Sequence, residues 1–77
     1  MTERLLNSLK AERERLGWTQ AELADRVGVS RKTVNTIENH VFSPSALLAI
    51  KLSRAIGRPV EELFTLTAGE ASPGDLA

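Results

Sequence analysis

Apolar residues recur every three or four positions along most of the chain, which is the spacing that places them on one face of a helix. No run alternates between apolar and polar residues, so the pattern predicts helices and no strand. Five helices are expected, between Thr2 and Gly17, from Gln20 to Gly28, from about Arg31 to Asn39, from Pro44-Ser45 to Gly57, and over the segment VEELF after Pro59.

Capping signals support these limits. Thr19 and Glu22 have the spacing of a capping box, and Ser30 is suited to cap the third helix. The expected inner faces are apolar throughout: Leu5, Leu6, Leu9 and Leu16; Leu23, Ala24 and Val27; Val34 and Ile37; Leu48, Leu52 and Ile56. The sequence therefore predicts a compact all-α domain of five helices.

A glycine interrupts the helical rhythm in the middle of the segment from Thr19 to Asn39. Two helices joined by a turn of three or four residues cross at a steep angle, about 90–120°. The backbones come close at the crossing, where Ala24 supplies a small side chain. The turn needs a positive φ, which Gly28 adopts without steric cost. These features predict a helix-turn-helix.

The third helix is expected to have an apolar edge and a polar edge. Val34 and Ile37 face the core, so the helical rotation turns other residues outward. The outward residues are Lys32, Asn35, Thr36 and Asn39, with Arg31 beside them in the first turn. Residues 26–35 carry three cations and no acid. Donors without nearby carboxylates are what a helix needs to read base edges and phosphates.

The spacing of this region also resembles a known family. Gln20, Ala24, Gly28, Val34 and Ile37 match the pattern of phage repressor and Cro-type helix-turn-helix proteins, the xenobiotic-response-element-like regulators. The segments LGWTQAELA, TIEN and PSALLAIKLSRAIGRPVEELF extend the likeness, which covers about residues 5–64. The resemblance implies a lambda-repressor-like DNA-binding domain.

The resemblance also implies roles for individual residues. Gln20 is expected to contact phosphate or an outer base, and Asn39 to contact the DNA backbone. Arg31, Lys32 and Thr36 occupy the base-reading edge of the recognition helix. The full set of expected DNA contacts is Gln20, Ser30, Arg31, Lys32, Asn35, Thr36 and Asn39.

Other positions are expected to be structural. The family commonly pairs the positions of Arg13 and Glu38 in a partly buried ion pair. His40 stands where the family often has glycine, and histidine tolerates a positive φ better than most residues, so we expect a turn there. Trp18 is expected to be a packing anchor. Phe42 has two candidate positions, over the core end of the loop or near DNA.

Composition bounds the remaining functions. The 77 residues allow one small domain, expected at residues 2–66, followed by a tail, 67–77, that is poor in large apolar side chains and expected to be disordered. There is no cysteine, a single histidine and a net charge of zero. No Ser–His–acid set or glycine-rich phosphate loop is present, so we expect no enzyme, no metal and no cofactor. No apolar run spans a bilayer, and a cytoplasmic location without membrane association is expected.

The end of the expected domain is rich in apolar residues, namely Val60, Leu63, Phe64 and Leu66. We expect part of this set to be core and the rest to be a dimer interface. The resulting hypothesis is a regulator that binds double-stranded DNA, a repressor acting as a homodimer on a palindromic operator. Two alternatives keep the fold: an antitoxin or adaptor with a protein partner, and a restriction–modification controller.

Overall fold

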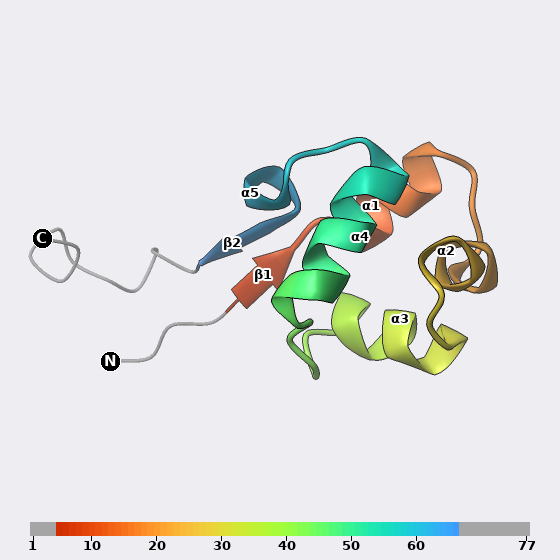
Figure 1. Cartoon of the computed structure of the whole chain (residues 1–77), viewed down its shortest axis with the longest axis horizontal. Helices are drawn as coiled ribbons and strands as arrows, with labels where there is room; N and C mark the ends of the chain where they lie inside the picture. Colours follow the sequence, from red (N-terminus) through yellow and green to blue (C-terminus); the bar gives the residue numbers. More distant parts are fainter. Residues whose placement is uncertain (1–4, 67–77) are drawn as a thin grey trace, which may run out of the picture.

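Five helices and a two-stranded sheet make up residues 5–66, the part of the chain that the computed structural model describes (Figure 1). The elements follow one another in the order β1 (Leu5–Asn7), α1 (Leu9–Arg15), α2 (Gln20–Val27), α3 (Arg31–Glu38), α4 (Ala46–Ile56), α5 (Val60–Leu63) and β2 (Phe64–Leu66). The predicted cap at Thr2 and the predicted tail at 67–77 lie outside the described residues.

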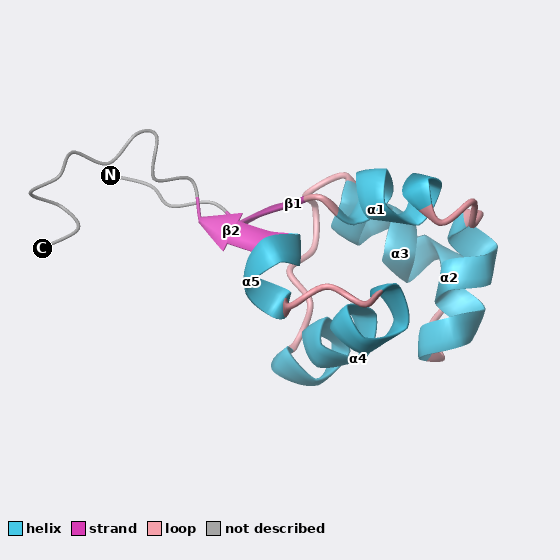
Figure 2. Ribbon diagram, turned by 90° about the horizontal axis from the view of Figure 1, so that it is seen from above, coloured by secondary structure: helices cyan, strands magenta, loops and turns pink. Residues whose placement is uncertain are grey.

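The all-α prediction is wrong at both ends of this range. β1 and β2 pair in antiparallel fashion, with Leu5 opposite Leu66 and Asn7 opposite Phe64. Figure 2 shows this sheet beside α5, at the end of the molecule opposite α2. The leucines at positions 5, 6 and 9 fit a helical spacing by coincidence, because the first helix begins only at Leu9. Phe64, assigned to the fifth helix by pattern, belongs to β2.

Asn7 explains why the first helix starts late. Its side-chain oxygen accepts a hydrogen bond from the Leu9 backbone N–H at 3.1 Å, and its amide nitrogen donates to the Ile37 carbonyl at 2.9 Å. The Ser8 N–H donates to the Leu63 carbonyl at 3.0 Å. Residues 5–7 are thus tied to distant parts of the chain, and Leu6, expected in the core, is 36% exposed.

The core fills the space between the helices. It contains all the residues expected on the inner faces of the second, third and fourth helices, together with residues from α5 and β2. The buried apolar residues are Leu9, Leu23, Ala24, Val27, Val34, Ile37, Leu48, Ala49, Leu52, Ile56, Leu63 and Phe64. Leu63 and Phe64 therefore belong to the core part of the apolar C-terminal set.

The turn between α2 and α3 has the predicted backbone. Gly28 ends α2 with φ 77° and ψ 35°, in the left-handed region. At the other end of α2, the Thr19 hydroxyl accepts from the Glu22 N–H, while the Glu22 carboxylate accepts from the Thr19 N–H at 2.7 Å. This backbone hydrogen bond lowers the pKa of Glu22 below its ordinary value. Both ends of α2 are fixed by local chemistry.

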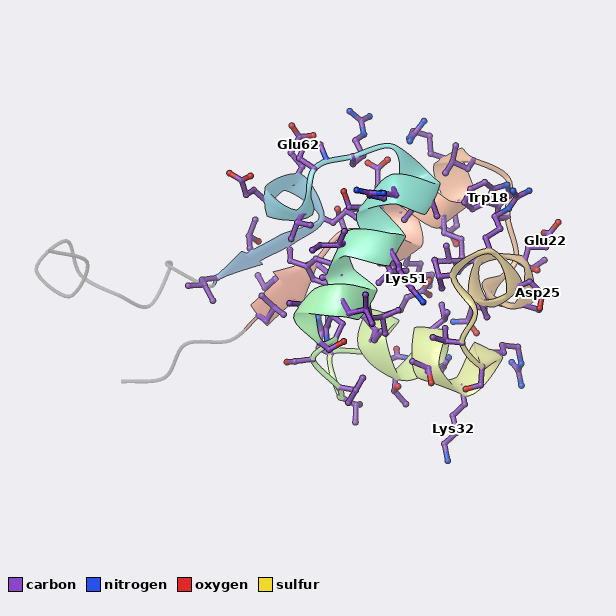
Figure 3. The ribbon with its side chains drawn as sticks, in the orientation of Figure 1. Trp18, Glu22, Asp25, Lys32, Lys51 and Glu62 are labelled. Atoms are coloured by element: carbon purple, nitrogen blue, oxygen red, sulfur yellow. The ribbon has the colours of Figure 1, made fainter. Side chains whose placement is uncertain are left out.

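Trp18 packs at the junction of α1 and α2, as expected of an anchor (Figure 3). Its side chain is half-buried against the core, and the Arg26 guanidinium lies 4.1 Å from the ring centroid. A cation over an aromatic face is attracted by the negative potential of the ring. This contact links α2 to the segment that precedes it.

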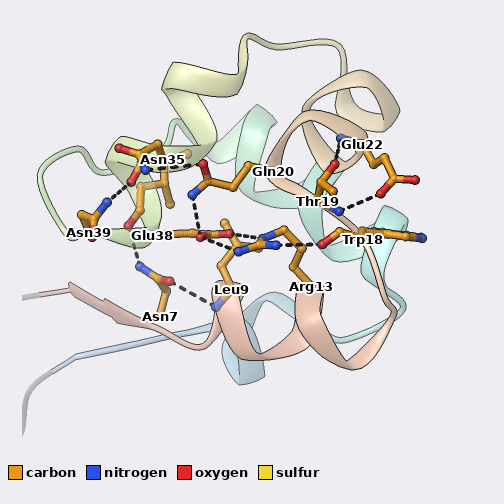
Figure 4. Close-up of polar contacts among 11 residues, drawn as sticks. Asn7, Leu9, Arg13, Trp18, Thr19, Gln20, Glu22, Asn35, Glu38 and Asn39 are labelled. Atoms are coloured by element: carbon orange, nitrogen blue, oxygen red, sulfur yellow. Dashed lines mark hydrogen bonds and ion pairs between the residues drawn. The ribbon is translucent and has the colours of Figure 1, made fainter.

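A buried ion pair joins α1 to α3 (Figure 4). Arg13 Nε donates to Glu38 Oε2 at 2.7 Å, and Nη2 donates to Oε1 at 3.2 Å. Arg13 Nη1 also donates to the Trp18 carbonyl at 2.7 Å. Each residue of the pair is only 8% exposed. Hydrogen bonding to Glu38 raises the pKa of Arg13 above its ordinary value, so the guanidinium stays charged.

Removing one partner of this pair leaves the other charge buried without compensation. We therefore expect Arg13→Met to cost about 3–5 kcal/mol in the free energy of unfolding. The melting temperature measured by circular dichroism should fall by more than about 10 °C. Arg13→Met combined with Glu38→Leu should recover much of the loss, because no buried charge remains.

Arg15→Met is the matched control, since Arg15 pairs with Glu12 at 2.7 Å on the surface, with 46% of the arginine side chain exposed. It should cost less than about 1 kcal/mol. Additive losses in the Arg13→Met, Glu38→Leu double variant would contradict a coupled pair.

Candidate nucleic-acid interface

The exposed edge of α3 presents cations at its N-terminal end. Arg31 and Lys32 are both exposed, and the first turn of α3 contains no acidic residue. Within residues 5–66, neither cation takes part in an ion pair. Lys32 points away from the body of the domain (Figure 3). These side chains are available to a negatively charged partner.

Ser30 has a structural role in addition to its candidate role. Its hydroxyl accepts a hydrogen bond from the Thr33 N–H at 3.1 Å and so caps α3. Capping satisfies one of the N–H groups that the first turn of a helix leaves without an intrahelical partner. The serine therefore helps to fix the N-terminal end of α3, where the two cations lie.

Gln20 is held by the same carboxylate that binds Arg13. Gln20 Nε2 donates to Glu38 Oε1 at 3.0 Å, and Gln20 Oε1 accepts from Asn35 Nδ2 at 3.4 Å (Figure 4). The chain of contacts runs from α1 through α3 to α2 and returns to α3. It fixes the orientation of the Gln20 amide, because one end faces a carboxylate and the other faces a donor.

Sequence reasoning missed this role of Gln20 and Asn35. The one available signal was the buried carboxylate itself. An ionised Glu38 has more acceptor sites than one guanidinium fills, so further donors had to lie nearby. The identity of those donors depends on how α2 and α3 cross, which no local pattern specifies.

Two further residues of the α3 edge also bond within the domain. Asn39 Nδ2 donates to the Asn35 carbonyl at 2.8 Å. The Thr36 hydroxyl donates to the Thr33 carbonyl at 3.0 Å. The hydrogen of the Thr36 hydroxyl is thus used internally, and its methyl group and oxygen lone pairs are what it can offer to a ligand.

The chain turns sharply after α3, at His40, which has φ 62° as the sequence predicted. The His40 N–H donates to the Ile37 carbonyl at 3.0 Å, and the Val41 N–H donates to the Thr36 carbonyl at 2.9 Å. This pair of bonds is the Schellman pattern that ends many helices. It turns Val41 and Phe42 back toward α3.

A hollow of about 340 Å³ lies between this turn and α3, lined by Lys32, Thr33, Thr36, Val41 and Phe42. Val41 is 77% exposed and Phe42 is 49% exposed. Of the two positions open to Phe42, the structure therefore places it on the surface, beside Lys32 and Thr36.

The apolar C-terminal set is divided between core and surface. Leu63 is 1% exposed and Phe64 is 8% exposed, whereas Leu66 is 57% exposed. Val60 is half-buried against the core. Only Val60 and Leu66 of the four therefore retain apolar surface in the single chain.

Within residues 5–66, no group of three or more His, Cys, Asp or Glu side chains is placed to hold a metal ion. None of the helices in the same range combines the length and apolar character needed to cross a membrane.

The chain is similar in sequence to transcriptional regulators and to an antitoxin. A regulator of the helix-turn-helix type from Methanothermobacter thermautotrophicus is 46% identical over 59 residues, which cover 75% of this chain and 86% of the relative. The Bacillus subtilis helix-turn-helix-type transcriptional regulator YgzD is 42% identical over 60 residues, covering 78% and 91%. The antitoxin HipB of Escherichia coli K12 is 40% identical over 52 residues, covering 68% of this chain and 59% of HipB.

A solved structure and a family model agree with these relatives. The hypothetical transcription factor NHTF from Neisseria superposes with a TM-score of 0.67 at 26% identity, over 70% of this chain and 61% of that one. The helix-turn-helix family model matches residues 9–63, which include all five helices. The chain therefore belongs to the helix-turn-helix family of Cro/CI type, whose members are DNA-binding regulators rather than enzymes.

Proposed function

We propose that this protein represses transcription by binding a palindromic operator as a homodimer, with α3 of each subunit in the major groove. The observation that carries the proposal is the exposed, acid-free N-terminal end of α3, where Arg31 and Lys32 have no ion-pair partner among residues 5–66. The Gly28 turn sets this helix against α2, and the Arg13–Glu38 pair ties it to α1.

The polar residues divide into two groups. Lys32 is exposed and Thr36, one turn later, is half-buried, and both lie on the edge of α3 that would meet the groove floor. Lys32 can donate to guanine O6 or N7. Gln20 and Asn39 lie where the DNA backbone would run. Gln20 Nε2 carries two hydrogens, so its bond to Glu38 leaves one for a phosphate oxygen. Arg31 and Asn35 flank the two groups, and Ser30 adds an N-terminal position near phosphate.

The proposed dimer rests on the apolar end of the chain. Leu66 is more than half exposed, and Val60 keeps part of its surface. Within residues 5–66 the two-stranded sheet has unpaired edges, and such edges readily accept another strand. An isologous contact around β2 would cover both features at once.

A second candidate function is that of an antitoxin, which would bind a protein partner. The similarity to HipB at 40% identity supports it. The same fold would serve both functions, so the α3 edge does not distinguish them. A gene for a toxic protein beside the gene for this chain would favour the antitoxin, whereas its absence would favour a free-standing repressor.

The proposed division of labour predicts different effects for two alanine variants. Lys32→Ala should cost about 1–3 kcal/mol on the selected operator and relax the base preference at one or two positions in each half-site. Gln20→Ala should weaken binding to all sequences more evenly, because phosphate contacts position a protein without reading sequence. The measurement is selection from a random DNA pool at one fixed salt concentration, since affinity depends on salt.

Lys51→Ala is the matched control, because Lys51 is an exposed lysine on α4 rather than α3 (Figure 3). It should leave both affinity and preferred sequence nearly unchanged. A uniform loss of affinity in Lys32→Ala, with the preferred sequence retained, would show that this edge does not read bases.

Analytical ultracentrifugation tests the proposed dimer. We expect a dimer in solution or on DNA, with recognition helices about 34 Å apart and a matching spacing of half-sites. Leu66→Glu should weaken self-association, because it places a charge in the apolar contact. Leu47→Glu changes a similarly exposed leucine on α4 and should not. A monomer that binds a single half-site as tightly as the full operator would refute the dimer.

A further inference from the structure

The hollow beside α3 is more apolar than a phosphate-binding surface should be. Residues 39–50, which include the loop after α3, contain no Lys, Arg, Asp or Glu. Instead, the loop presents Val41 at 77% exposure and Phe42 at 49% exposure. Large apolar side chains on the same side as the candidate DNA-reading residues require an apolar partner if they are to leave water.

The position of these two side chains is fixed by the backbone. The N–H groups of Val41 and Phe42 both donate to the Thr36 carbonyl, at 2.9 and 3.2 Å. His40, in the left-handed region, donates its N–H to Ile37 and brings its ring nitrogen Nδ1 within 3.3 Å of Asn7 Nδ2. The hollow is therefore preorganised by the end of α3, which reduces the entropy lost on binding.

The lining of the hollow combines one cation with apolar groups. Lys32 stands at its edge, and Thr36 uses its hydroxyl hydrogen on the Thr33 carbonyl, which leaves its methyl group for contact. In the major groove of DNA, the one apolar group that base edges present is the C5-methyl group of thymine. A phosphate would gain no charge partner from Val41 or Phe42.

We propose that Val41 and Phe42 are specificity-determining residues that lie outside the recognition helix and receive a thymine methyl group in the hollow beside Thr36. Lys32, at the rim of the same hollow, would contact the neighbouring base or phosphate. This inference rests on the proposed docking of α3 in the major groove. The loop after α3 would thus add apolar base contacts to the polar contacts made by the first turns of α3.

The probe is the duplex recovered by selection, with each thymidine replaced in turn by deoxyuridine, which removes only the methyl group. Binding of the full chain is measured by fluorescence anisotropy at fixed salt. We expect deoxyuridine at one or two positions in each half-site to weaken wild-type binding about fourfold, the factor that corresponds to burying one methyl group. Other positions should be insensitive.

Three variants locate the contact. In Val41→Ala and in Phe42→Ala, the penalty for deoxyuridine at the sensitive positions should shrink toward none. Leu47→Ala changes an exposed leucine on α4, outside the hollow, and should keep the full penalty. Because Val41 and Phe42 are exposed, melting curves of their variants should stay close to that of the wild type.

The outcomes that overturn the proposal are distinct. If the penalty persists in Val41→Ala and Phe42→Ala but vanishes in Thr36→Ser, which keeps the hydroxyl and removes the methyl group, then α3 alone reads the thymine. If a preferred sequence exists but no thymine is sensitive, the hollow does not read methyl groups, although the proposed function stands. If Val41→Ala and Phe42→Ala instead change the oligomeric state, the hollow is a contact surface for another protein chain and does not bind a thymine methyl group. If selection recovers no preferred sequence, the proposed function and this inference fail together.

Discussion

The buried pair of Arg13 and Glu38 constrains the arrangement of the first three helices. Two opposite charges with 8% exposure are tolerated only when hydrogen bonds satisfy them. Arg13 therefore also donates to the Trp18 carbonyl just before α2. Glu38 also accepts from Gln20, which lies in the first turn of α2. Shifting any one of these helices would leave a charge or a carbonyl without a partner. The pair thus couples the geometry of the helix-turn-helix to the rest of the domain.

The helix-turn-helix could be predicted from the sequence because its determinants are local. A glycine at positive φ, a capping box of four residues and the rotation of a helix involve neighbours along the chain. Pairing of β1 with β2 is different, because three residues on each side pair across 57 to 61 positions of the chain. Strands this short leave no period-two signal, and Leu5, Leu6 and Leu9 fit a helical face equally well. The contacts of Asn7 with Leu9 and Ile37, and of Ser8 with Leu63, explain the choice.

For the candidate site, the sequence likewise predicted what depends on local helix geometry and not what depends on contacts between distant residues. The outward direction of Lys32, Asn35 and Thr36 follows from fixing Val34 and Ile37 in the core. The bonds that Gln20, Thr36 and Asn39 make within the domain do not follow, since they depend on distances between side chains and on rotamers. The exposed position of Phe42 likewise depends on how the turn at His40 directs the chain, and the sequence alone left two positions open.

The antiparallel pairing of Leu5 with Leu66 has a topological consequence. The two ends of the described domain lie side by side, in register, at the sheet and apart from the exposed edge of α3 (Figures 1 and 2). A short linker between these ends would make the domain a closed ring, which can then be cut elsewhere without losing any strand or helix contact. The fold is in this sense suited to circular permutation, with the exposed segment around Ser43, between α3 and α4, as a natural place for new termini.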